Sequence, residues 1–273
     1  MTLVDELLRR IGLDARPAAD VAGLHAVHRA YLERIPYEAL AVQLGESGVL
    51  DDEASAARIV AGRGGYCFEM NGALGLLLAG LGFPVEHHQA KVGPRDEDAP
   101  TNHRVLLVDA GGERWIADAG LGEGFLDPLP LREGTHASGP FAWTIEREPD
   151  GGWWVAQHAW GSFAGFRIRP EIATLDDFRP HHARLSTDPE SSFVQTLVVQ
   201  RPLADRIVTL RARTLTAKGP EVDESRVLAS RDELERTLRD VFGIAVLDEA
   251  RLTQLWEQAS TQHEAYLARE AAG

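Results

Sequence analysis

The chain has 273 residues, 44% of them hydrophobic and 26% charged, which is the composition of a soluble globular protein with enough material for a sizeable core. Its 28 basic and 42 acidic residues give a net charge of −14, which disfavours nucleic acid and anionic membranes as partners. A single cysteine excludes an internal disulfide, and neither a signal peptide nor a bilayer-spanning apolar run is visible, so we expect a cytoplasmic protein. We expect it to be a monomer or a homodimer.

The first third of the chain has the apolar spacing of helices. Asp20 is a candidate N-cap, Pro36 ends the second periodic run, and Gly62 ends the third. We expect four helices, over residues 3–11, 24–32, 56–60 and 67–81.

From Val85 onward the pattern becomes that of strands. We expect strands over residues 103–109, 114–119, 141–147, 153–160, 193–200 and 206–211. Gly111-Gly112 and the segment 148–152 supply turns between successive runs, so the middle of the chain reads as antiparallel hairpins.

The C-terminal part mixes strand and helix. Ser230 and Glu233 have the spacing of a capping box that starts a helix, and Gly243 stops it. A final helix is expected over 248–267. These patterns predict the α+β class, with no internal repeat and no low-complexity linker.

The stretch Arg63-Gly-Gly-Tyr-Cys67-Phe-Glu-Met-Asn71 contains the only cysteine. Two glycines permit a sharp turn in front of Cys67, and the N-terminal end of a helix favours a thiolate by lowering the pKa of a thiol. A lone cysteine is also commonly a buried apolar residue, so this stretch alone leaves the catalytic and the structural interpretation equally open.

A nucleophilic cysteine needs a base, and the base needs an orienting acceptor. His103 begins a predicted strand, and Asp118 lies on the second strand of the same hairpin, at a similar height. An aspartate within an apolar strand requires a partner, and acceptance of a hydrogen bond from His103 Nδ1 would supply one. We therefore predict a catalytic triad of Cys67, His103 and Asp118. The pair His181-His182 lacks the spacing of metal ligands, and no metal is expected.

These motifs resemble the arylamine N-acetyltransferase family. The resemblance includes the cysteine stretch, Asn102-His103-Arg-Val-Leu-Leu-Val108 and Asp118-Ala-Gly-Leu-Gly122, in that order. It extends to Ile35-Pro-Tyr-Glu38-Ala-Leu upstream and to Leu185-Ser-Thr-Asp-Pro-Glu-Ser-Ser-Phe193 downstream, so it covers at least residues 30–200.

The resemblance implies three regions around a core similar to that of cysteine proteases: a helical bundle (1–84), an antiparallel β-barrel (85–192) and an α/β lid (193–273). It implies ping-pong transfer of an acetyl group from acetyl-CoA, the co-substrate, through acetyl-Cys67. The acceptor would be an aromatic amine, an arylhydrazine or an N-hydroxyarylamine. A backbone N–H, such as that of Cys67, would stabilise the oxyanion.

Supporting roles are expected for three pairs of residues. Arg63 and Glu38 would hold the nucleophile turn, and Gly120 and Gly122 would let the backbone approach CoA. The aromatic substrate would lie against two aromatic walls, Tyr37 and Phe125.

Two departures from the family pattern concern the acceptor. Ala119 and Leu121 stand where relatives commonly have valine and phenylalanine, which leaves room near the cleft. The segment 93–100 is acidic and would disfavour anionic acceptors.

Three alternatives remain open from the sequence. An amide synthase that releases a carrier-bound polyketide chain would keep the triad and would not respond to acetyl-CoA. A cysteine hydrolase would use water as the acceptor, and a binding protein would have an inert Cys67 thiol.

Overall fold

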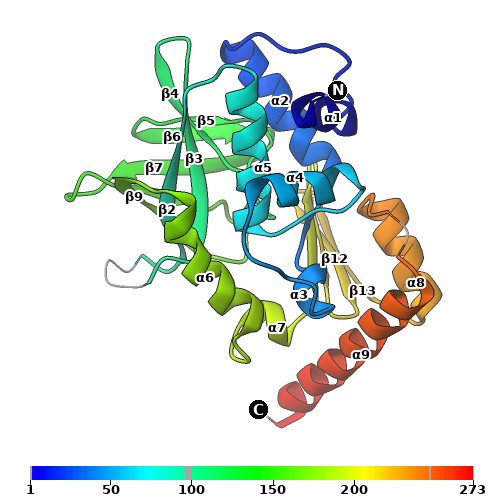
Figure 1. The fold of residues 1–273 in the computed structure, drawn as a ribbon. Coiled ribbons are helices and arrows are strands. Elements are labelled where there is room, and N and C mark those ends of the chain that lie inside the picture. Colours follow the sequence, from blue (N-terminus) through cyan, green and yellow to red (C-terminus); the bar gives the residue numbers. More distant parts are fainter. Residues whose placement is uncertain (1, 96–99, 246, 273) are drawn as a thin grey trace.

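The N-terminal part of the fold is helical, as the sequence predicts. The structure is a computed structural model that describes residues 2–95, 100–245 and 247–272 (Figure 1). The helices here are α1 (Leu3–Arg10), α2 (Val21–Arg34), α3 (Leu40–Gln43), α4 (Asp52–Val60) and α5 (Cys67–Gly80). The predicted N-cap is correct, since Asp20 accepts a hydrogen bond from the Gly23 N–H at 2.8 Å.

Helix α5 passes through the centre of this part and carries Cys67 as its first residue. It contacts α1, α2 and α4 on one side and strands β2 (Val85–Gly93) and β3 (His103–Ala110) on another. Because neighbours surround it, α5 is apolar around most of its circumference rather than along one stripe. This burial fixes the position of the nucleophile relative to the sheet.

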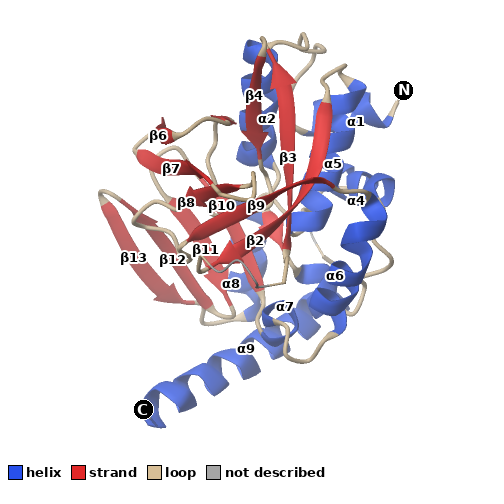
Figure 2. Ribbon diagram, turned by 90° about the vertical axis from the view of Figure 1, so that its left-hand side faces the viewer, coloured by secondary structure: helices blue, strands red, loops and turns tan. Residues whose placement is uncertain are grey.

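The middle of the chain forms an antiparallel sheet that curls into a nearly closed barrel (Figures 1 and 2). Its strand order is β5-β4-β3-β2-β9-β8-β7-β6. The remaining members are β4 (Glu113–Ala117), β5 (Leu129–Pro130), β6 (Gly134–Ser138), β7 (Phe141–Arg147), β8 (Trp153–Ala156) and β9 (Gly165–Ile172). Strands β3 and β4 form the predicted hairpin, with Gly111 and Gly112 at positive φ in its turn.

A second antiparallel sheet closes the fold at the C-terminal end, in the order β1-β10-β11-β12-β13 (Figure 2). It combines β1 (Tyr37–Glu38) from the helical part with four later strands: β10 (Val198–Pro202), β11 (Ile207–Arg211), β12 (Thr214–Gly219) and β13 (Val222–Val227). Helix α8 (Arg231–Arg236), the π-helical turn Thr237–Val241 and helix α9 (Glu249–Ala272) cover one face, where they share an apolar core with β10 and β11. The end of α9 extends beyond the sheet (Figure 1).

Two predicted strands differ from the structure. The segment 193–200 begins with a helical turn, α7 (Ser192–Gln195), because the Ser191 hydroxyl accepts a hydrogen bond from the Phe193 N–H at 3.3 Å. The strand predicted over 153–160 ends at Ala156, because the chain turns where the Gly161 N–H donates to the His158 carbonyl at 3.1 Å. Helix α6 (Leu175–Thr187) and the hairpin of β12 and β13 are not predicted from the sequence.

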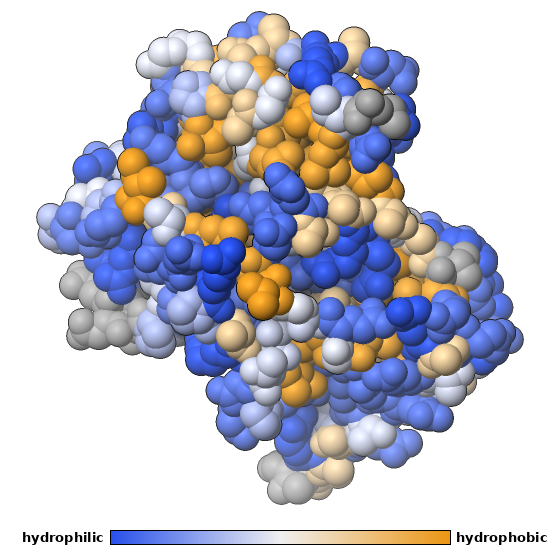
Figure 3. Space-filling model, in the orientation of Figure 1, coloured by the Kyte–Doolittle hydropathy of each residue, from blue (hydrophilic) through white to orange (hydrophobic). Residues whose placement is uncertain are grey.

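The surface is hydrophilic over much of the face in Figure 3, with apolar side chains gathered in the upper half, over the N-terminal helices. Among the helices that the structure describes, none is long and apolar enough to cross a membrane.

Candidate active site

The turn before Cys67 is held by buried carboxylates. Glu38 accepts hydrogen bonds from Arg63 Nε at 3.0 Å and from the Gly64 N–H at 3.2 Å. Glu69 accepts from the Tyr66 N–H at 3.1 Å and pairs with Arg58. Arg63 and Glu38 therefore lie together behind the turn, as expected from the sequence. The Cys67 side chain is buried.

The structure also brings the predicted histidine and aspartate together. His103 is the first residue of β3, and Asp118 follows the last residue of β4. His103 Nε2 lies 2.7 Å from Asp118 Oδ2. Because a carboxylate only accepts, Nε2 carries the proton. The predicted contact through Nδ1 is wrong: the ring is turned so that Nε2 faces Asp118, and Nδ1 is the nitrogen left for chemistry.

Three further groups hold Asp118, which is completely buried. Its Oδ1 accepts from Asn71 Nδ2 and from the Gly120 N–H, both at 2.8 Å. The Asp118 N–H donates to His28 Nε2 at 3.1 Å. The carboxylate is therefore hydrogen-bonded at both oxygens, which compensates for its burial.

The role of His28 depends on its neutral form. Its Nδ1 lies 2.9 Å from the Leu126 carbonyl and donates to it, so that Nε2 is free to accept from Asp118. Burial lowers the pKa of His28 to about 4, and the Leu126 carbonyl opposes that shift. Near neutral pH the imidazole is therefore uncharged.

The electrostatic environment of Cys67 differs from the sequence expectation. Burial raises the pKa of the Cys67 thiol, and the Asp118 carboxylate raises it further. The N–H groups of Phe68 and Arg104 act in the opposite direction. The Phe68 N–H at the start of α5 lowers this pKa, as the sequence predicts, but desolvation outweighs it, so that the pKa of the thiol is raised rather than lowered. The thiol hydrogen points to the Asn102 carbonyl, with Sγ 3.6 Å from that oxygen.

A cavity of about 260 Å³, here called the cysteine cavity, opens beside the thiol. Its lining includes Cys67, His103, Tyr37 and Gly120. Gly120 permits a close approach, since a Cβ there would lie 2.7 Å from the Cα of Cys67.

Two of the residues predicted for the site lie elsewhere. Gly122 has φ +71° and packs against Gln200, where a Cβ would lie 2.3 Å from Oε1, and it is not part of the cavity lining. Phe125 is completely buried in the barrel core, where it stacks on His28 with ring centroids 5.8 Å apart. The structure does not bring Phe125 to the cavity, because its side chain points into the barrel.

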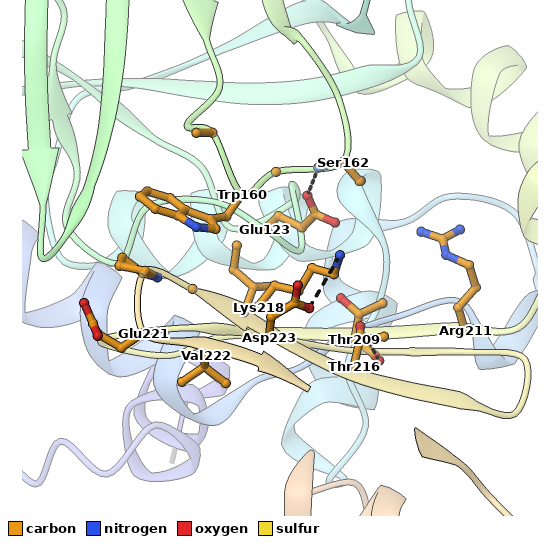
Figure 4. Close-up of a pocket in the computed structure, with 15 residues that line it drawn as sticks. Glu123, Trp160, Ser162, Thr209, Arg211, Thr216, Lys218, Glu221, Val222 and Asp223 are labelled. Atoms are coloured by element: carbon orange, nitrogen blue, oxygen red, sulfur yellow. Dashed lines mark hydrogen bonds and ion pairs between the residues drawn. The ribbon is translucent and has the colours of Figure 1, made fainter. Parts of the chain in front are cut away.

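A second cavity of about 710 Å³, here called the outer cavity, adjoins the first and shares Glu123, Ser162 and Arg211 with it (Figure 4). Glu123 is buried at this junction. Its Oε1 accepts from Gln200 Nε2 at 2.8 Å, and its Oε2 accepts from the Ser162 N–H at 2.6 Å.

Part of the acidic segment predicted to border the site, residues 96–99, lies outside the described residues. Across residues 2–95, 100–245 and 247–272, no group of three or more histidine, cysteine or carboxylate side chains is placed to hold a metal.

Comparison with known proteins identifies the family. A family model described as N-acetyltransferase matches residues 20–251. The arylamine N-acetyltransferase of Mycolicibacterium smegmatis is 33% identical over 253 residues, covering 88% of this chain and 91% of that protein. The chain belongs to the arylamine N-acetyltransferase family.

Solved structures of the arylamine N-acetyltransferase family have the same fold. The enzyme from Mycobacterium abscessus superposes with a TM-score of 0.85 at 28% identity, over 94% of each chain. The enzyme from Mycobacterium marinum, solved in complex with CoA, gives a TM-score of 0.83 at 25% identity, over 93% of this chain and 98% of that one.

Of the two residues that differ from the arylamine N-acetyltransferase pattern after Asp118, only one lines the cavity. Leu121 lines the cysteine cavity, so a side chain smaller than phenylalanine leaves room there. Ala119 is buried in the core shared by the helices and β3, away from the cavity lining.

Sequence reasoning missed the residues that support the triad from a distance along the chain. Asn71 was visible within the cysteine stretch, but its contact with Asp118 spans 47 residues. His28 lies 90 residues from Asp118 and has no motif around it. Glu123 and Gln200 meet only because the barrel and the C-terminal sheet face each other.

Proposed function

We propose that this chain transfers an acetyl group from acetyl-CoA to an arylamine, an arylhydrazine or an N-hydroxyarylamine by a ping-pong reaction through acetyl-Cys67. The observation that carries the proposal is the hydrogen-bonded pair of Asp118 and His103 on the same cavity as the only cysteine. Family membership supports both the reaction and the donor.

In the first half-reaction, His103 Nδ1 accepts the Cys67 proton as Sγ attacks the thioester carbonyl. Because burial disfavours a lone thiolate, attack and proton transfer proceed together. The new S–C bond forms a tetrahedral intermediate, whose oxyanion is stabilised by the Cys67 N–H, one of the unpaired first amides of α5. The bond to the CoA sulfur then breaks, and the proton on His103 passes to that sulfur, so that CoA leaves as a thiol.

In the second half-reaction, the neutral amine attacks the acetyl carbonyl of acetyl-Cys67. His103 Nδ1 accepts a proton from the amine nitrogen, and the C–S bond to Cys67 breaks. The proton returns to Sγ, which releases the N-acetyl product and restores the thiol. Asp118 keeps Nε2 protonated and stabilises the imidazolium that forms in each half.

The supporting roles are proposed on the geometry around the triad. Glu38 and Arg63 fix the nucleophile turn, and Gly120 lets the acyl group approach Cys67. Gly122 keeps the loop after β4 close to Gln200, and Tyr37 forms one wall for the aromatic ring. We assign the regions 1–84, 85–192 and 193–273 to the bundle, the barrel and the lid.

The setting of the reaction is proposed from composition. A chain with one cysteine suits the reducing cytoplasm. A net charge of −14 disfavours nucleic acid as a partner. A monomer or a homodimer is sufficient, since the triad comes from one chain.

The proposal is tested by mixing the purified protein with acetyl-CoA, without any amine, and measuring its intact mass. We expect one acetyl adduct that is absent in Cys67→Ala, and release of that acetyl group to an arylamine such as aniline. If no adduct forms although the thiol still reacts with iodoacetamide, the result would favour a carrier-fed amide synthase. If the adduct forms but is released only to water, the result would favour a hydrolase. An inert thiol would overturn the enzymatic interpretation in favour of a binding protein.

A further inference from the structure

The neighbouring histidines His181 and His182 lie on α6, the helix that follows β9 and leads into α7 (Figure 1). His182 is buried, and its Nδ1 lies 2.5 Å from the hydroxyl oxygen of Tyr66. Tyr66 is the N-cap residue of α5 and directly precedes Cys67. His182 therefore contacts the turn that carries the nucleophile.

The direction of this hydrogen bond follows from the other ring nitrogen of His182. Its Nε2 lies 2.9 Å from the Gly48 carbonyl, a backbone acceptor that no side-chain change removes. Because a carbonyl only accepts, Nε2 carries a proton, and in the neutral ring Nδ1 accepts from the Tyr66 hydroxyl. Burial favours this neutral ring, since it lowers the pKa of His182, although the Gly48 carbonyl raises it.

Tyr66 is held by its ring as well as by its hydroxyl. Its ring centroid lies 5.7 Å from that of Phe68 and 5.1 Å from that of Phe193, and the residue is completely surrounded. A buried hydroxyl that loses its partner costs free energy, so Tyr66 does not move away from His182 without a penalty. The position of the residue before Cys67 therefore depends on α6 as well as on α5.

His181 contacts the segment that carries the proposed base. Its Nε2 lies 3.1 Å from the hydroxyl oxygen of Thr101, a buried residue two positions before His103. Asn102 lies between these two residues, and its carbonyl faces the Cys67 thiol with 3.6 Å between oxygen and Sγ. The two histidines of α6 thus contact the chain just before the nucleophile and just before the base.

Both histidines act from outside the site. The described lining of the cysteine cavity includes neither of them, nor Tyr66 and Thr101. Cys67 and His103 belong to different elements, α5 and β3, and α6 is a third element that contacts the segments in front of both. Catalytic groups keep a productive geometry only when surrounding residues hold them to within a fraction of an ångström.

We propose that His181 and His182 are positioning residues, which together hold the Cys67 thiol and the His103 ring at the separation that proton transfer requires. The inference rests on the proposed function, because it takes His103 as the base for Cys67. His182 acts through Tyr66 on the start of α5, and His181 acts through Thr101 on the start of β3.

The test compares two variants of His182 that replace different ring nitrogens. Asparagine places its amide near the position of Nδ1, and glutamine places its amide near that of Nε2. His182→Gln therefore loses the acceptor for Tyr66, and we expect kcat for acetyl transfer to fall about tenfold through displacement of the nucleophile. The KM for acetyl-CoA should not change, because the cavity lining is retained. His182→Asn keeps the acceptor and should have the wild-type kcat.

Tyr66→Phe removes the same hydrogen bond from the other side and keeps the ring. We expect a similar fall in kcat, and the double variant Tyr66→Phe/His182→Gln should be no slower than either single variant. Alkylation of Cys67 by iodoacetamide at pH 7 should slow in parallel. If His182→Gln unfolds at a lower urea concentration but keeps the wild-type kcat and alkylation rate, the histidine only stabilises the fold and the inference is wrong.

His88→Gln is the matched control. His88 is also buried, its Nδ1 donates to the Arg169 carbonyl at 2.9 Å, and it is absent from the described lining of the cysteine cavity. The variant loses one hydrogen bond of a ring nitrogen, as His182→Gln does, and should keep the wild-type kcat. An equal fall of kcat in both variants would show a general loosening of the fold and would overturn the inference.

The contact of His181 is tested in the same way. His181→Leu removes the partner of Thr101, and we expect kcat to fall about threefold, the effect of one neutral hydrogen bond. His181→Gln places an amide near the position of Nε2 and should keep the wild-type kcat. Equal kcat values in these two variants would refute the role of His181.

Failure of the proposed function gives a different result. If acetyl-CoA does not acetylate the wild-type protein, although iodoacetamide alkylates it faster than it alkylates His182→Gln, the proposed donor is wrong and the positioning of the thiol stands. If acetyl-CoA acetylates both proteins at the same rate and iodoacetamide alkylates both at the same rate, the positioning role is wrong and the proposed donor stands.

Discussion

At Cys67, two effects of opposite sign act on the thiol. Burial and the Asp118 carboxylate raise its pKa, whereas nearby N–H groups lower it, and the first pair dominates. A buried thiol of this kind becomes reactive only when a nearby base accepts its proton. In the proposed mechanism that base is His103 Nδ1, because proton transfer from Cys67 to His103 leaves the net charge of the site unchanged.

This balance predicts how alkylation of Cys67 depends on pH. In the wild-type protein, iodoacetamide should react well below the ordinary thiol pKa of about 8.5, because His103 accepts the proton. In His103→Gln the thiol loses its acceptor, and the midpoint of the rate profile should move above about 8.5. The rates are measured by intact mass between pH 5 and 10. Identical profiles for both proteins would show that His103 does not activate the thiol.

At the same scale, the sequence indicated the three residues of the proposed triad but not their geometry. Cys67, His103 and Asp118 could be chosen because each stands at the start or end of a strongly patterned element. The ring orientation of His103 depends on the position of Asp118 along the neighbouring strand. The sequence predicts the register of the two strands only to within a residue, so it cannot predict which ring nitrogen faces Asp118. The position of Phe125 in the barrel core is not predictable from the sequence, because an aromatic residue near a motif has the same sequence pattern whether it faces a cavity or a core.

Among the elements, the start of α5 and the loop after β4 lie close together at Gly120. A Cβ there would lie 2.7 Å from the Cα of Cys67 and 2.8 Å from Asn71 Nδ2. Both neighbours belong to the site, so neither can move without disturbing Cys67 or Asp118.

Gly120→Ala should therefore displace the nucleophile. We expect kcat/KM to fall about 100-fold, the effect of a misplacement near 1 Å, and the free energy of unfolding to fall by about 1–3 kcal/mol. Gly48→Ala is the control, because a Cβ at Gly48 meets nothing within 4 Å. Acetyl transfer and urea unfolding are measured on both variants. Full activity in Gly120→Ala would mean that the loop after β4 moves to accommodate the methyl group without displacing Cys67.

Elements with a strong apolar period were predictable, and elements with mixed patterns were not. The helices α2 and α5 and the hairpin of β3 and β4 have clear periods and distinct turns. The hairpin of β12 and β13 was missed because most of its side chains are polar and partly or fully exposed. Helix α6 was missed because Pro180 lies within it.

For the whole molecule, two neutral histidines, one buried and one half-buried, link stability to pH. Burial lowers the pKa of His28 and of His87 to about 4, so the unfolded chain binds protons more readily than the folded one below about pH 6.5. Their contribution to stability is complete above that pH and is lost as the pH falls toward 4.

We expect His28 alone to account for a loss of about 3 kcal/mol in the free energy of unfolding between pH 7 and pH 4. Urea unfolding at a series of pH values measures this loss. In His28→Gln the free energy of unfolding should depend less steeply on pH. At pH 5 this variant should take up about one proton fewer on unfolding than the wild-type protein does. An unchanged slope would mean that His28 is charged in the folded protein.

The short strand β1 joins two parts of the chain that are made at different times. Tyr37 and Glu38 pair with Gln200 and Val199 of β10. Synthesis on the ribosome proceeds from the N-terminus, so Cys67 emerges long before β10 does. Glu38, which fixes the turn in front of Cys67, gains its strand partner only when most of the chain has been translated. The growing polypeptide therefore carries the turn in front of Cys67 for most of its synthesis before β1 has a strand partner.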